Sequence, residues 1–322
     1  MNIYDVAKSA GVSTATVSRY LNRSGYVGKN TAARIQQAID ASGYRISALA
    51  QKLSKGDSLK LIGLVCYDIE DLYYAKCASV LEKRLSAAGY EIILSNTGKS
   101  VDKGHAVVDS LLRKKVDALI FIGSVFMDGT GSLLSEAAKS TPCFLINARF
   151  DRDNVYSAYC DDEKATAEAA RRMLESGRER VFYVRGADTY GARTKIRGFL
   201  QAVPDPARVL CCGETFDEVE KGFAALYQTH RPDGILCSDD GIAAGILKGA
   251  QALGISVPQE LALVGHNDSL LSRTSTPALS SIDNRVETLS QITADNIVAL
   301  FHGDPIRKCV EAEFRLVRRQ TF

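Results

Sequence analysis

The sequence predicts two parts, a small all-α head over residues 1–44 and a larger α/β body over residues 60–322. Apolar residues of the head recur with the period of a helix, whereas short apolar runs alternate with helical patterns along the rest of the chain. A chain of 322 residues also exceeds the usual size of one domain.

Charge separates the two parts in the same way. Residues 1–60 contain nine Lys or Arg and three Asp, while the remaining residues contain 31 basic and 35 acidic side chains. A basic head on a mildly acidic body favours contact with a polyanion, of which nucleic acid is the commonest. On charge alone, a solvated basic face is an equal alternative.

Two short helices about a glycine turn open the chain. An apolar stripe over residues 3–10 predicts the first helix, which Gly11 ends. Ser13 is placed to cap a second helix over residues 14 to about 21, and a third helix is predicted over residues 31–42. The first two form a helix-turn-helix, and the three together can bury a common core.

The second helix of a helix-turn-helix lies in the major groove of DNA, where residues near its N-terminus reach the base edges. We therefore expect Thr14, Ala15 and Arg19 to face the bases. Arg19 is the strongest reader, because a guanidinium pairs bidentately with guanine. Other side chains of this helix suit phosphates, namely Ser13, Thr16, Ser18 and Asn22. The alternative, a generic three-helix bundle, is disfavoured by short helices whose polar face is small and rich in hydroxyl groups.

The body repeats βα units. Apolar runs of strand length, with helical patterns between them, occur at residues 61–66, 92–94, 118–122, 143–146, 181–184, 209–212, 234–237 and 261–264. Such alternation predicts a parallel, doubly wound sheet. A last strand-like run spans residues 311–317.

The sequence lacks the motifs that mark nucleotide-binding proteins and several classes of enzyme. The first apolar run is followed by neither a Gly-rich dinucleotide loop nor a P-loop, so we expect no nucleotide cofactor. No Ser-His-Asp spacing, zinc-protease motif or nucleophile elbow occurs, so we expect no enzyme, no metal and no other cofactor. The eight cysteines lie mostly in apolar runs without a C-x-x-C pair, which predicts reduced core thiols.

The sequence also lacks membrane and export signals. Its first residues form no basic segment followed by an apolar run, and no stretch of about 18 apolar residues occurs. We therefore expect a soluble, cytoplasmic protein with no membrane partner.

Residues 4–22, which contain the helix-turn-helix, resemble the signature of the LacI/GalR (lactose/galactose repressor) family of transcriptional regulators. The similarity covers essentially the whole chain, with landmarks at residues 161–162, 238–245, 263–268 and 277–282. The resemblance implies a helix-turn-helix domain, a hinge helix over residues 45–59, and a core like the periplasmic sugar-binding proteins. That core has two doubly wound parallel-sheet subdomains joined by three crossovers, with a ligand cleft between them. Their expected ranges are about 60–160 with 284–311, and about 161–283 with 312–322.

The hinge helix of this family carries a leucine that wedges into the minor groove, and Leu53 stands at that position. Such wedging kinks the duplex. Two hinge residues depart from the family pattern, since Ile46 stands where proline is usual and Ala48 where arginine is frequent. These departures put hinge docking in question and leave major-groove reading as expected.

The resemblance also implies effector contacts in the cleft. Lys195 stands where an arginine usually grips the effector, and a point charge there replaces a planar fork. Asp239 and Asn267 stand where an amide and a carboxylate are usual, so the two groups are exchanged. An aromatic pair after the first strand is matched by Tyr73 and Tyr74, and further polar candidates are Asp68, Asn147 and, by position alone, Ser124.

Aromatic rings together with carboxylates and amides suit a sugar or a sugar derivative, and Lys195 also suits an anionic one. The alternatives are a solvated lysine and tyrosines that only cover the core. The resemblance further implies a repressor that binds a near-palindromic operator in double-stranded DNA as a homodimer under allosteric control by the effector. Two rivals stay open. One is a sugar receptor without regulation, against which the head argues. The other is a regulator whose effector is another protein, as in the catabolite-control members of the family.

Overall fold

The computed structural model describes residues 2–22, 24–44, 60–98, 100–128 and 131–322. The chain divides into two units, with the boundary before Lys60. The predicted hinge over residues 45–59, with Ile46, Ala48 and Leu53, lies outside the described residues. The prediction of a helical head and a body with two doubly wound sheets is confirmed.

Three helices form the head: α1 (Ile3–Ala10), α2 (Thr14–Asn22) and α3 (Lys29–Ser42). The first two follow the predicted helices, and α3 begins slightly earlier than expected. Asn2 and Asp5 form a capping box at the start of α1. Gly11 follows the last turn with a φ of 62°, a left-handed conformation that costs glycine little. The turn between α1 and α2 therefore depends on this glycine.

The head has its own small core, to which each helix contributes. Val6, Val17 and Ile35 are fully buried there. A hydrogen-bond chain adds to this packing, because the Tyr20 hydroxyl donates to Gln36 at 2.8 Å and Gln36 donates to Asp40 at 2.8 Å. The orientation of α2 against α3 is thus held by both apolar and polar contacts.

The first body sheet has the strand order β11-β5-β4-β3-β1-β2, and every strand is parallel to its neighbours. The helices α5 and α13 pack on one face, against Ile62 and Leu64 of β1, and α6 packs on the other face at Gly63. The elements of this subdomain are β1 (Leu61–Cys66), α5 (Leu72–Ala87), β2 (Glu91–Asn96), α6 (Val101–Arg113), β3 (Ala118–Ile122), the 3-10 helix η1 (Ser124–Met127), α7 (Gly131–Ala137), β4 (Cys143–Ile146), β5 (Val155–Cys160), α13 (Val286–His302) and β11 (Cys309–Ala312).

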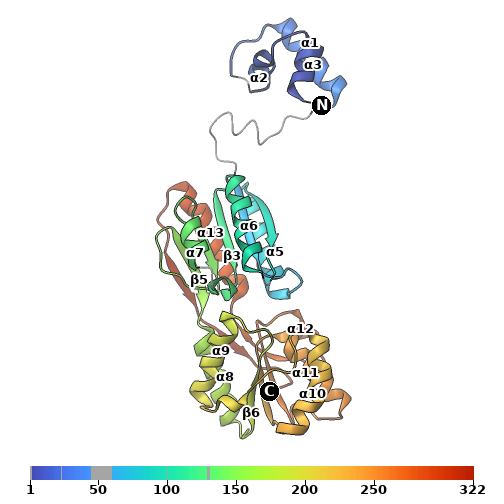
Figure 1. The fold of residues 1–322 in the computed structure, drawn as a ribbon, viewed down its shortest axis with the longest axis vertical. Coiled ribbons are helices and arrows are strands. Elements are labelled where there is room, and N and C mark those ends of the chain that lie inside the picture. The colour runs from blue at the N-terminus through green and yellow to red at the C-terminus, as the bar shows by residue number, and fades with distance from the viewer. Residues whose placement is uncertain (1, 23, 45–59, 99, 129–130) are drawn as a thin grey trace. The chain divides into compact units, whose positions relative to one another are not determined.

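The second sheet has the order β12-β10-β9-β8-β6-β7, so both sheets are wound in the same way about their first strand. Its helices α10 and α11 pack on one face and α8 and α9 on the other (Figure 1). The elements are α8 (Asp162–Glu175), β6 (Val181–Val184), α9 (Tyr190–Ala202), the 3-10 helix η2 (Pro206–Arg208), β7 (Val209–Leu210), α10 (Phe216–His230), β8 (Gly234–Cys237), α11 (Asp240–Ala252), β9 (Ala262–His266), α12 (Leu270–Thr274), β10 (Ser280–Asp283) and β12 (Arg315–Val317).

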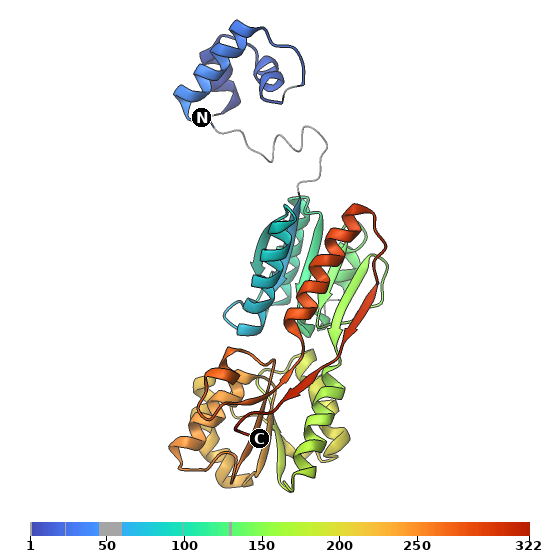
Figure 2. The same ribbon diagram turned by 180° about the vertical axis from the view of Figure 1, so that it is seen from behind.

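Three crossovers join the subdomains: from β5 to α8, from β10 to α13, and from β11 to β12. The single strand-like run predicted over residues 311–317 is therefore wrong, because the chain leaves one sheet after Ala312 and enters the other at Arg315. Figure 2 shows this red segment passing between the two sheets. The Phe314 side chain packs against the cores of both subdomains. One edge of the second sheet departs from the parallel pattern, since β12 runs antiparallel to β10.

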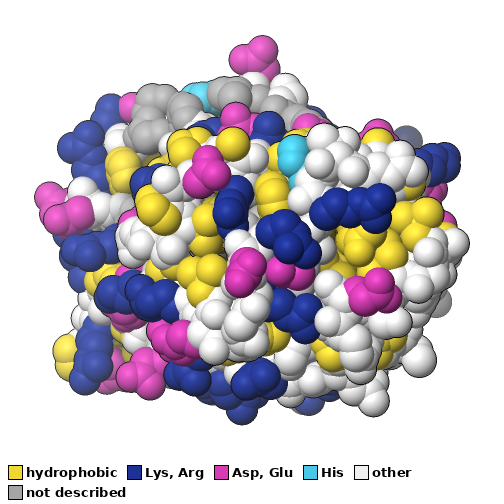
Figure 3. Space-filling view, turned by 90° about the horizontal axis from the view of Figure 1, so that it is seen from below, with side chains coloured by type: hydrophobic (Ala, Val, Ile, Leu, Met, Phe, Trp, Pro, Cys, Tyr) yellow, Lys and Arg dark blue, Asp and Glu magenta, His cyan; other side chains and the backbone are white. Residues whose placement is uncertain are grey.

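The outer end of the second subdomain carries charges of both signs. In Figure 3, lysine and arginine side chains lie among acidic and apolar ones over this face. Within the same subdomain, Arg180 pairs with Asp233 and Lys248 with Glu220. A face of mixed sign attracts a polyanion weakly, which agrees with the separation of charge along the sequence.

Gly198 lies where α9 packs closest to α8, and the space there admits no side chain. A Cβ atom at this position would overlap the backbone carbonyl oxygen of Glu163, which cannot rotate away. We expect Gly198→Ala to lower the free energy of unfolding by about 1–3 kcal/mol, measured by urea denaturation, because the two helices must separate. Gly104→Ala in α6 is the matched control, since a Cβ there meets nothing within 4 Å. Equal stability of the two variants would contradict this account.

Candidate functional site

The side chains predicted to meet DNA gather on α2 and at its start. Those described are Ser13, Thr14, Ala15, Thr16, Ser18, Arg19 and Asn22, whereas Leu53 lies outside the described residues. The Ser13 hydroxyl accepts a hydrogen bond from the backbone N–H of Thr16 at 3.2 Å, so Ser13 caps the helix as its spacing predicts. The Asn22 amide donates to the Ser18 hydroxyl at 3.2 Å. These hydrogen bonds hold polar groups in place at both ends of α2.

Arg19 is exposed on α2, and it forms no ion pair within the described part of the head. Its aliphatic stem lies beside Gly25, with Cδ 3.4 Å from where a Cβ of that residue would stand. The stem is thus supported while the guanidinium stays available. Two tyrosines that the sequence reasoning missed, Tyr4 and Tyr26, are 71% and 91% exposed. Exposed tyrosines on a basic domain are candidates for phosphate contact.

In the body, a cavity of about 330 Å³ lies between the two sheets, at the carboxyl ends of their strands. This is where ligands bind in open α/β sheets. All eight predicted effector residues line it: Asp68, Tyr73, Tyr74, Ser124, Asn147, Lys195, Asp239 and Asn267. The sequence reasoning missed further polar lining residues, among them Tyr67, Asp71, Asp162, Thr189, Glu214 and Ser238. Their common signal is position, since each lies in the loop after a strand or at the first residue of the helix that follows.

A buried hydrogen-bond network closes the cavity on the crossover side. The Asn147 amide donates to Oδ2 of Asp162 at 2.9 Å, and the other oxygen of Asp162 lies 3.1 Å from Nε2 of His266. Asn147 also accepts from the backbone N–H of Cys160 at 3.2 Å. Asn147 belongs to the first subdomain and His266 to the second, so Asp162 bridges them at the first crossover. His266, the last residue of β9, is thus part of this bridge.

Both titratable groups of the bridge have a pKa below its usual value, for different reasons. Burial raises the pKa of the Asp162 carboxyl, but His266, the Lys195 ammonium and the Asn147 amide together outweigh it and bring that pKa below its usual value. Burial and the nearby Lys195 ammonium lower the pKa of His266. The bridge therefore consists of an ionised carboxylate and a neutral imidazole that donates from Nε2.

Lys195 and Asp239 likewise have structural contacts. Lys195 donates to the backbone carbonyl oxygen of Ser238 at 2.8 Å. Asp239 accepts from the backbone N–H of Ile242 at 2.8 Å and from the Ser238 hydroxyl at 2.8 Å. Asp239 is thus the N-cap of α11 and a lining residue at once. The Lys195 ammonium is held in the wall of the cavity and is not a solvated helix side chain.

The aromatic pair occupies the wall formed by the first subdomain. The Tyr73 and Tyr74 rings lie 5.2 Å apart at 89°, an edge-to-face contact. Tyr73 is 7% exposed, so most of its surface covers the core, as the alternative interpretation held. Tyr74 lies against Gly123, where a Cβ atom would come within 3.0 Å of the ring. Gly123 has a φ of 94°, so both conformation and space require glycine here.

Carboxylates outnumber cations around this cavity. Asp68 and Asp71 each accept one backbone N–H, from Glu70 at 3.0 Å and from Tyr73 at 2.8 Å. Loss of hydration within the cleft, and then the carboxylates of Asp239 and Asp68, raise the pKa of Asp71. Lys195 is the one cationic side chain among the described lining residues. The cavity is therefore suited to a ligand that donates many hydrogen bonds.

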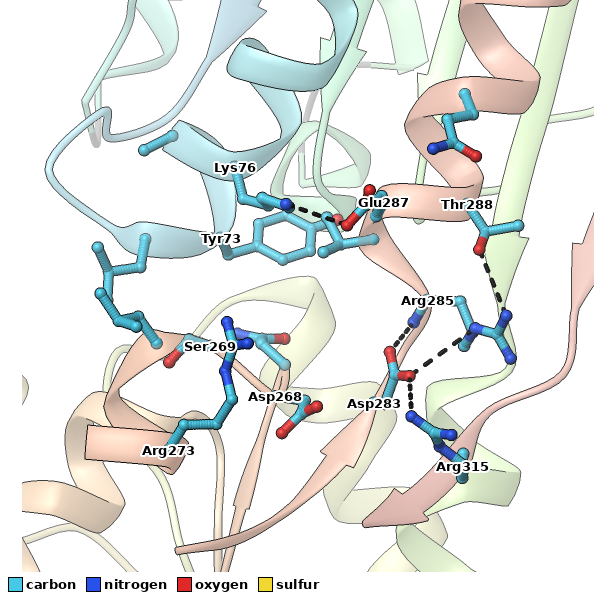
Figure 4. Close-up of a pocket in the computed structure, with 16 residues that line it drawn as sticks. Tyr73, Lys76, Asp268, Ser269, Arg273, Asp283, Arg285, Glu287, Thr288 and Arg315 are labelled. Carbon is cyan, nitrogen blue, oxygen red and sulfur yellow. Dashed lines mark hydrogen bonds and ion pairs between the residues drawn. The ribbon is translucent and has the colours of Figure 1, made fainter. Parts of the chain in front are cut away.

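A second cavity of about 630 Å³ lies beyond Tyr73 and Asn267, which line both cavities. Figure 4 shows Lys76 paired with Glu287 on one side and Asp283 between Arg285 and Arg315 on the other. Arg285 also donates to Thr288 of α13, at 3.4 Å. These contacts tie the end of β10 to the start of α13 at the second crossover, so this cavity borders the joint between the subdomains.

The described residues can be examined for metal-binding groups and for membrane-spanning helices. No group of three His, Cys, Asp or Glu side chains is arranged there to hold a metal ion. None of the described helices has the length and apolar character that a membrane span needs. Of the eight cysteines, Cys211 and Cys309 are exposed, and burial raises the pKa of core thiols such as Cys77, to about 12.

The neutral state of His266 predicts a pH dependence of stability. Because its pKa is lowered in the folded protein, the unfolded chain takes up a proton first as the pH falls below about 6.5. The free energy of unfolding should therefore fall with pH, by up to about 1.4 kcal/mol per pH unit from this group. His266→Gln keeps a donor toward Asp162 and should remove this contribution, as measured by urea denaturation between pH 6.5 and 5. The other three histidines are common to both proteins, so identical slopes would exclude His266 as the source.

The sequence matches known families over both parts. Residues 2–47 match bacterial regulatory proteins of the lacI family, and residues 170–322 match a periplasmic binding protein-like domain. An HTH-type transcriptional regulator of Lachnoclostridium phytofermentans is 30% identical over 331 residues, covering 100% of this chain and 99% of that protein. The HTH-type transcriptional repressor PurR of Yersinia pestis is 31% identical, covering 99% and 96%.

Solved structures share the fold. The lac repressor dimer bound to operator and the anti-inducer ONPF superposes with a TM-score of 0.78 at 22% identity, over 100% of this chain and 98% of that one. A LacI-family regulator from Silicibacter pomeroyi gives a TM-score of 0.83 at 20% identity, over 100% and 99%. The complex of the regulator CelR with cellobiose gives 0.71 at 21% identity, over 100% of both chains. Full-length similarity to transcriptional regulators, together with a helix-turn-helix head and a two-sheet body, shows that this chain belongs to the lacI family and is a DNA-binding transcriptional regulator, not an enzyme.

Proposed function

We propose that this regulator is a repressor that binds a near-palindromic operator as a homodimer, and that a sugar or sugar derivative in the cleft of the body controls it. In this proposal residues 1–44 read DNA, residues 45–59 connect, and residues 60–322 bind the effector. The convergence of eight expected effector residues on one cavity is the observation that carries it. A relative is called a repressor, and related structures are described as a dimer on operator DNA and as a cellobiose complex.

The chemistry of the cavity supports a hydroxylated effector. The carboxylates of Asp68, Asp71 and Asp239 accept hydrogen bonds from sugar hydroxyls, and the Tyr74 side chain, which lines the cavity, offers aromatic surface to a ring. Lys195 already donates to a backbone carbonyl oxygen at 2.8 Å. With carboxylates in excess around a single ammonium group, a neutral sugar is favoured over a sugar acid.

The position of the cavity supports allosteric control. Its lining comes from both subdomains, which three crossovers join. A ligand that contacts both changes the relative free energies of their open and closed arrangements. If the effector changes the affinity for the operator by some factor, the operator must change the affinity for the effector by the same factor.

For DNA reading, we expect Arg19→Ala to weaken operator binding by about 1–3 kcal/mol and to relax discrimination at one base pair of each half-site. Arg34→Ala is the matched control, because Arg34 is also exposed and basic but lies on α3. The Arg34 variant should bind all operator sequences more weakly by the same factor. Binding to operator variants by fluorescence anisotropy measures both effects, and unchanged discrimination in the Arg19 variant would remove it from base reading.

For effector response, Lys195→Met should weaken effector binding at least about tenfold, a loss of about 1.4 kcal/mol, while leaving operator binding without effector intact. The removed ammonium is the one cation among the described lining residues. Lys221→Met, at an exposed position of α10, is the control. Calorimetry with a panel of sugars and sugar acids, followed by operator release assays, measures both properties. A Lys195 variant with normal response refutes the assignment, and failure of every sugar with the unmodified protein refutes the sugar class.

A further inference from the structure

The cleft does not end at the cavity described above. A second lobe of about 360 Å³ adjoins it, and the two share Tyr67, Val125, Ala187, Thr189 and Glu214 in their linings. We call the first cavity the inner lobe and the second the outer lobe. The shared residues form the neck between them, so a single ligand can extend from one lobe into the other.

The strand order explains why the cleft extends in this direction. The inner lobe collects loops that follow the central strands of both sheets and, in the second sheet, the loop after the edge strand β7. The outer lobe adds Thr97 and Gly98, which come directly after the edge strand β2, and Asp188 and Arg193 from the loop after β6 and from α9. On the opposite side the crossovers and the Asn147–Asp162–His266 bridge close the cleft. Extension of the ligand is therefore possible toward the β2 edge.

The lining of the outer lobe differs in chemistry from that of the inner lobe. Val125, Phe126 and the glycines 98 and 104 present apolar or backbone surface, and Tyr67 lies at the neck with its ring 6.2 Å from that of Tyr74. The cation of this lobe, Arg193, pairs with both Asp128 and Asp188, and Glu214 adds a third carboxylate at the neck, so the lobe disfavours an anionic group. The outer lobe is thus suited to an uncharged ring with an apolar face.

We propose that the effector is a two-unit molecule, a glycoside whose sugar occupies the inner lobe and whose second, uncharged ring occupies the outer lobe. This rests on the proposed function, since it extends the same site. The shared chemistry fits either a disaccharide or an aryl glycoside. In both, the second ring packs against the aromatic and apolar surface beyond the neck.

The outer lobe also lies against a contact between the subdomains. Asp128, which follows η1 of the first subdomain, accepts a hydrogen bond from the backbone N–H of Tyr190 and pairs with Arg193, both on α9 of the second subdomain. Close by, α9 meets η1, where a Cβ on Gly191 would lie 2.6 Å from the Ser124 hydroxyl oxygen. A ring in the outer lobe therefore rests on the contact that an opening of the cleft must break.

Gly104 offers a way to fill the outer lobe alone. It lines this lobe but not the inner one, it lies within α6, and a Cβ there meets nothing within 4 Å. A leucine side chain at this position would start in open space and occupy the volume meant for the second ring. Gly104→Ala is the matched control, because it changes the helix in the same way and leaves the lobe nearly empty.

The experiment is calorimetry of the full chain with three sets of probes: monosaccharides, disaccharides built from them, and their 4-nitrophenyl glycosides. For the unmodified protein, at least one two-unit probe should bind tenfold or more tightly than its own monosaccharide. Gly104→Leu should abolish that advantage without changing monosaccharide affinity, and Gly104→Ala should keep it. The set that shows the advantage, disaccharide or aryl glycoside, identifies the second ring.

Two results overturn the proposal. Equal affinity for a monosaccharide and its two-unit probes would refute binding of a second ring in the outer lobe. So would an affinity advantage that survives Gly104→Leu. Neither result contradicts a sugar site in the inner lobe. If no probe binds at all, the proposed sugar site is refuted as well. The two failures are therefore distinguishable. If the leucine variant does not fold by circular dichroism, Asp188→Trp narrows the same lobe from the second subdomain and should have the same effect.

Discussion

The Asp162 carboxylate accepts hydrogen bonds from both halves of the body, from Asn147 at 2.9 Å and from His266 at 3.1 Å, and the geometry of the cleft depends on this bridge. A carboxylate buried in this way is stable only while its partners hold it, since an unpaired buried charge is very costly. The bridge therefore keeps the two sheets close at the crossover end. At the other end of the cleft, Asp128 meets α9 through an exposed hydrogen bond and an ion pair. The cavity thus lies between a buried bridge on one side and an exposed contact on the other.

The residues that line the inner lobe are to a large extent the residues that begin the helices. Asp71, Thr189 and Asp239 are the N-caps of α5, α9 and α11, and each accepts a backbone N–H of its own helix. In a parallel sheet the carboxyl ends of the strands and the N-termini of the following helices meet at one edge, so capping and ligand binding use the same positions. This explains why polar side chains concentrate there without leaving helix ends unsatisfied. It also explains the excess of carboxylates, because Asp is among the preferred N-cap residues.

The head and the body are stabilised in different ways. The head buries few side chains, so its helices rely on caps and on the Tyr20–Gln36–Asp40 chain to hold α2 in position with Arg19 exposed. The body has ample core in each subdomain and places its polar groups between them. An effector in the cleft can influence DNA binding only by favouring one arrangement of the subdomains over another, which is why contacts from both are essential to the proposed control.

The sequence by itself determined what depends on local pattern. Helical periodicity and Gly11 located α1 and α2, the spacing of Ser13 identified its cap, and alternating apolar runs located most strands of both sheets. Resemblance in short motifs named eight residues that line one cavity, although they lie far apart in the chain. Only the tertiary structure decided the rest. The partnership of Asp162 with His266 joins residues on different elements, and no local signal marks it. The split of residues 311–317 into β11 and β12 arises because Phe314 packs against two cores at a crossover, whereas periodicity reports only that the run is extended. The outer lobe exists because loops after β2, β3 and β6 meet across two sheets, a consequence of strand order that no single segment encodes.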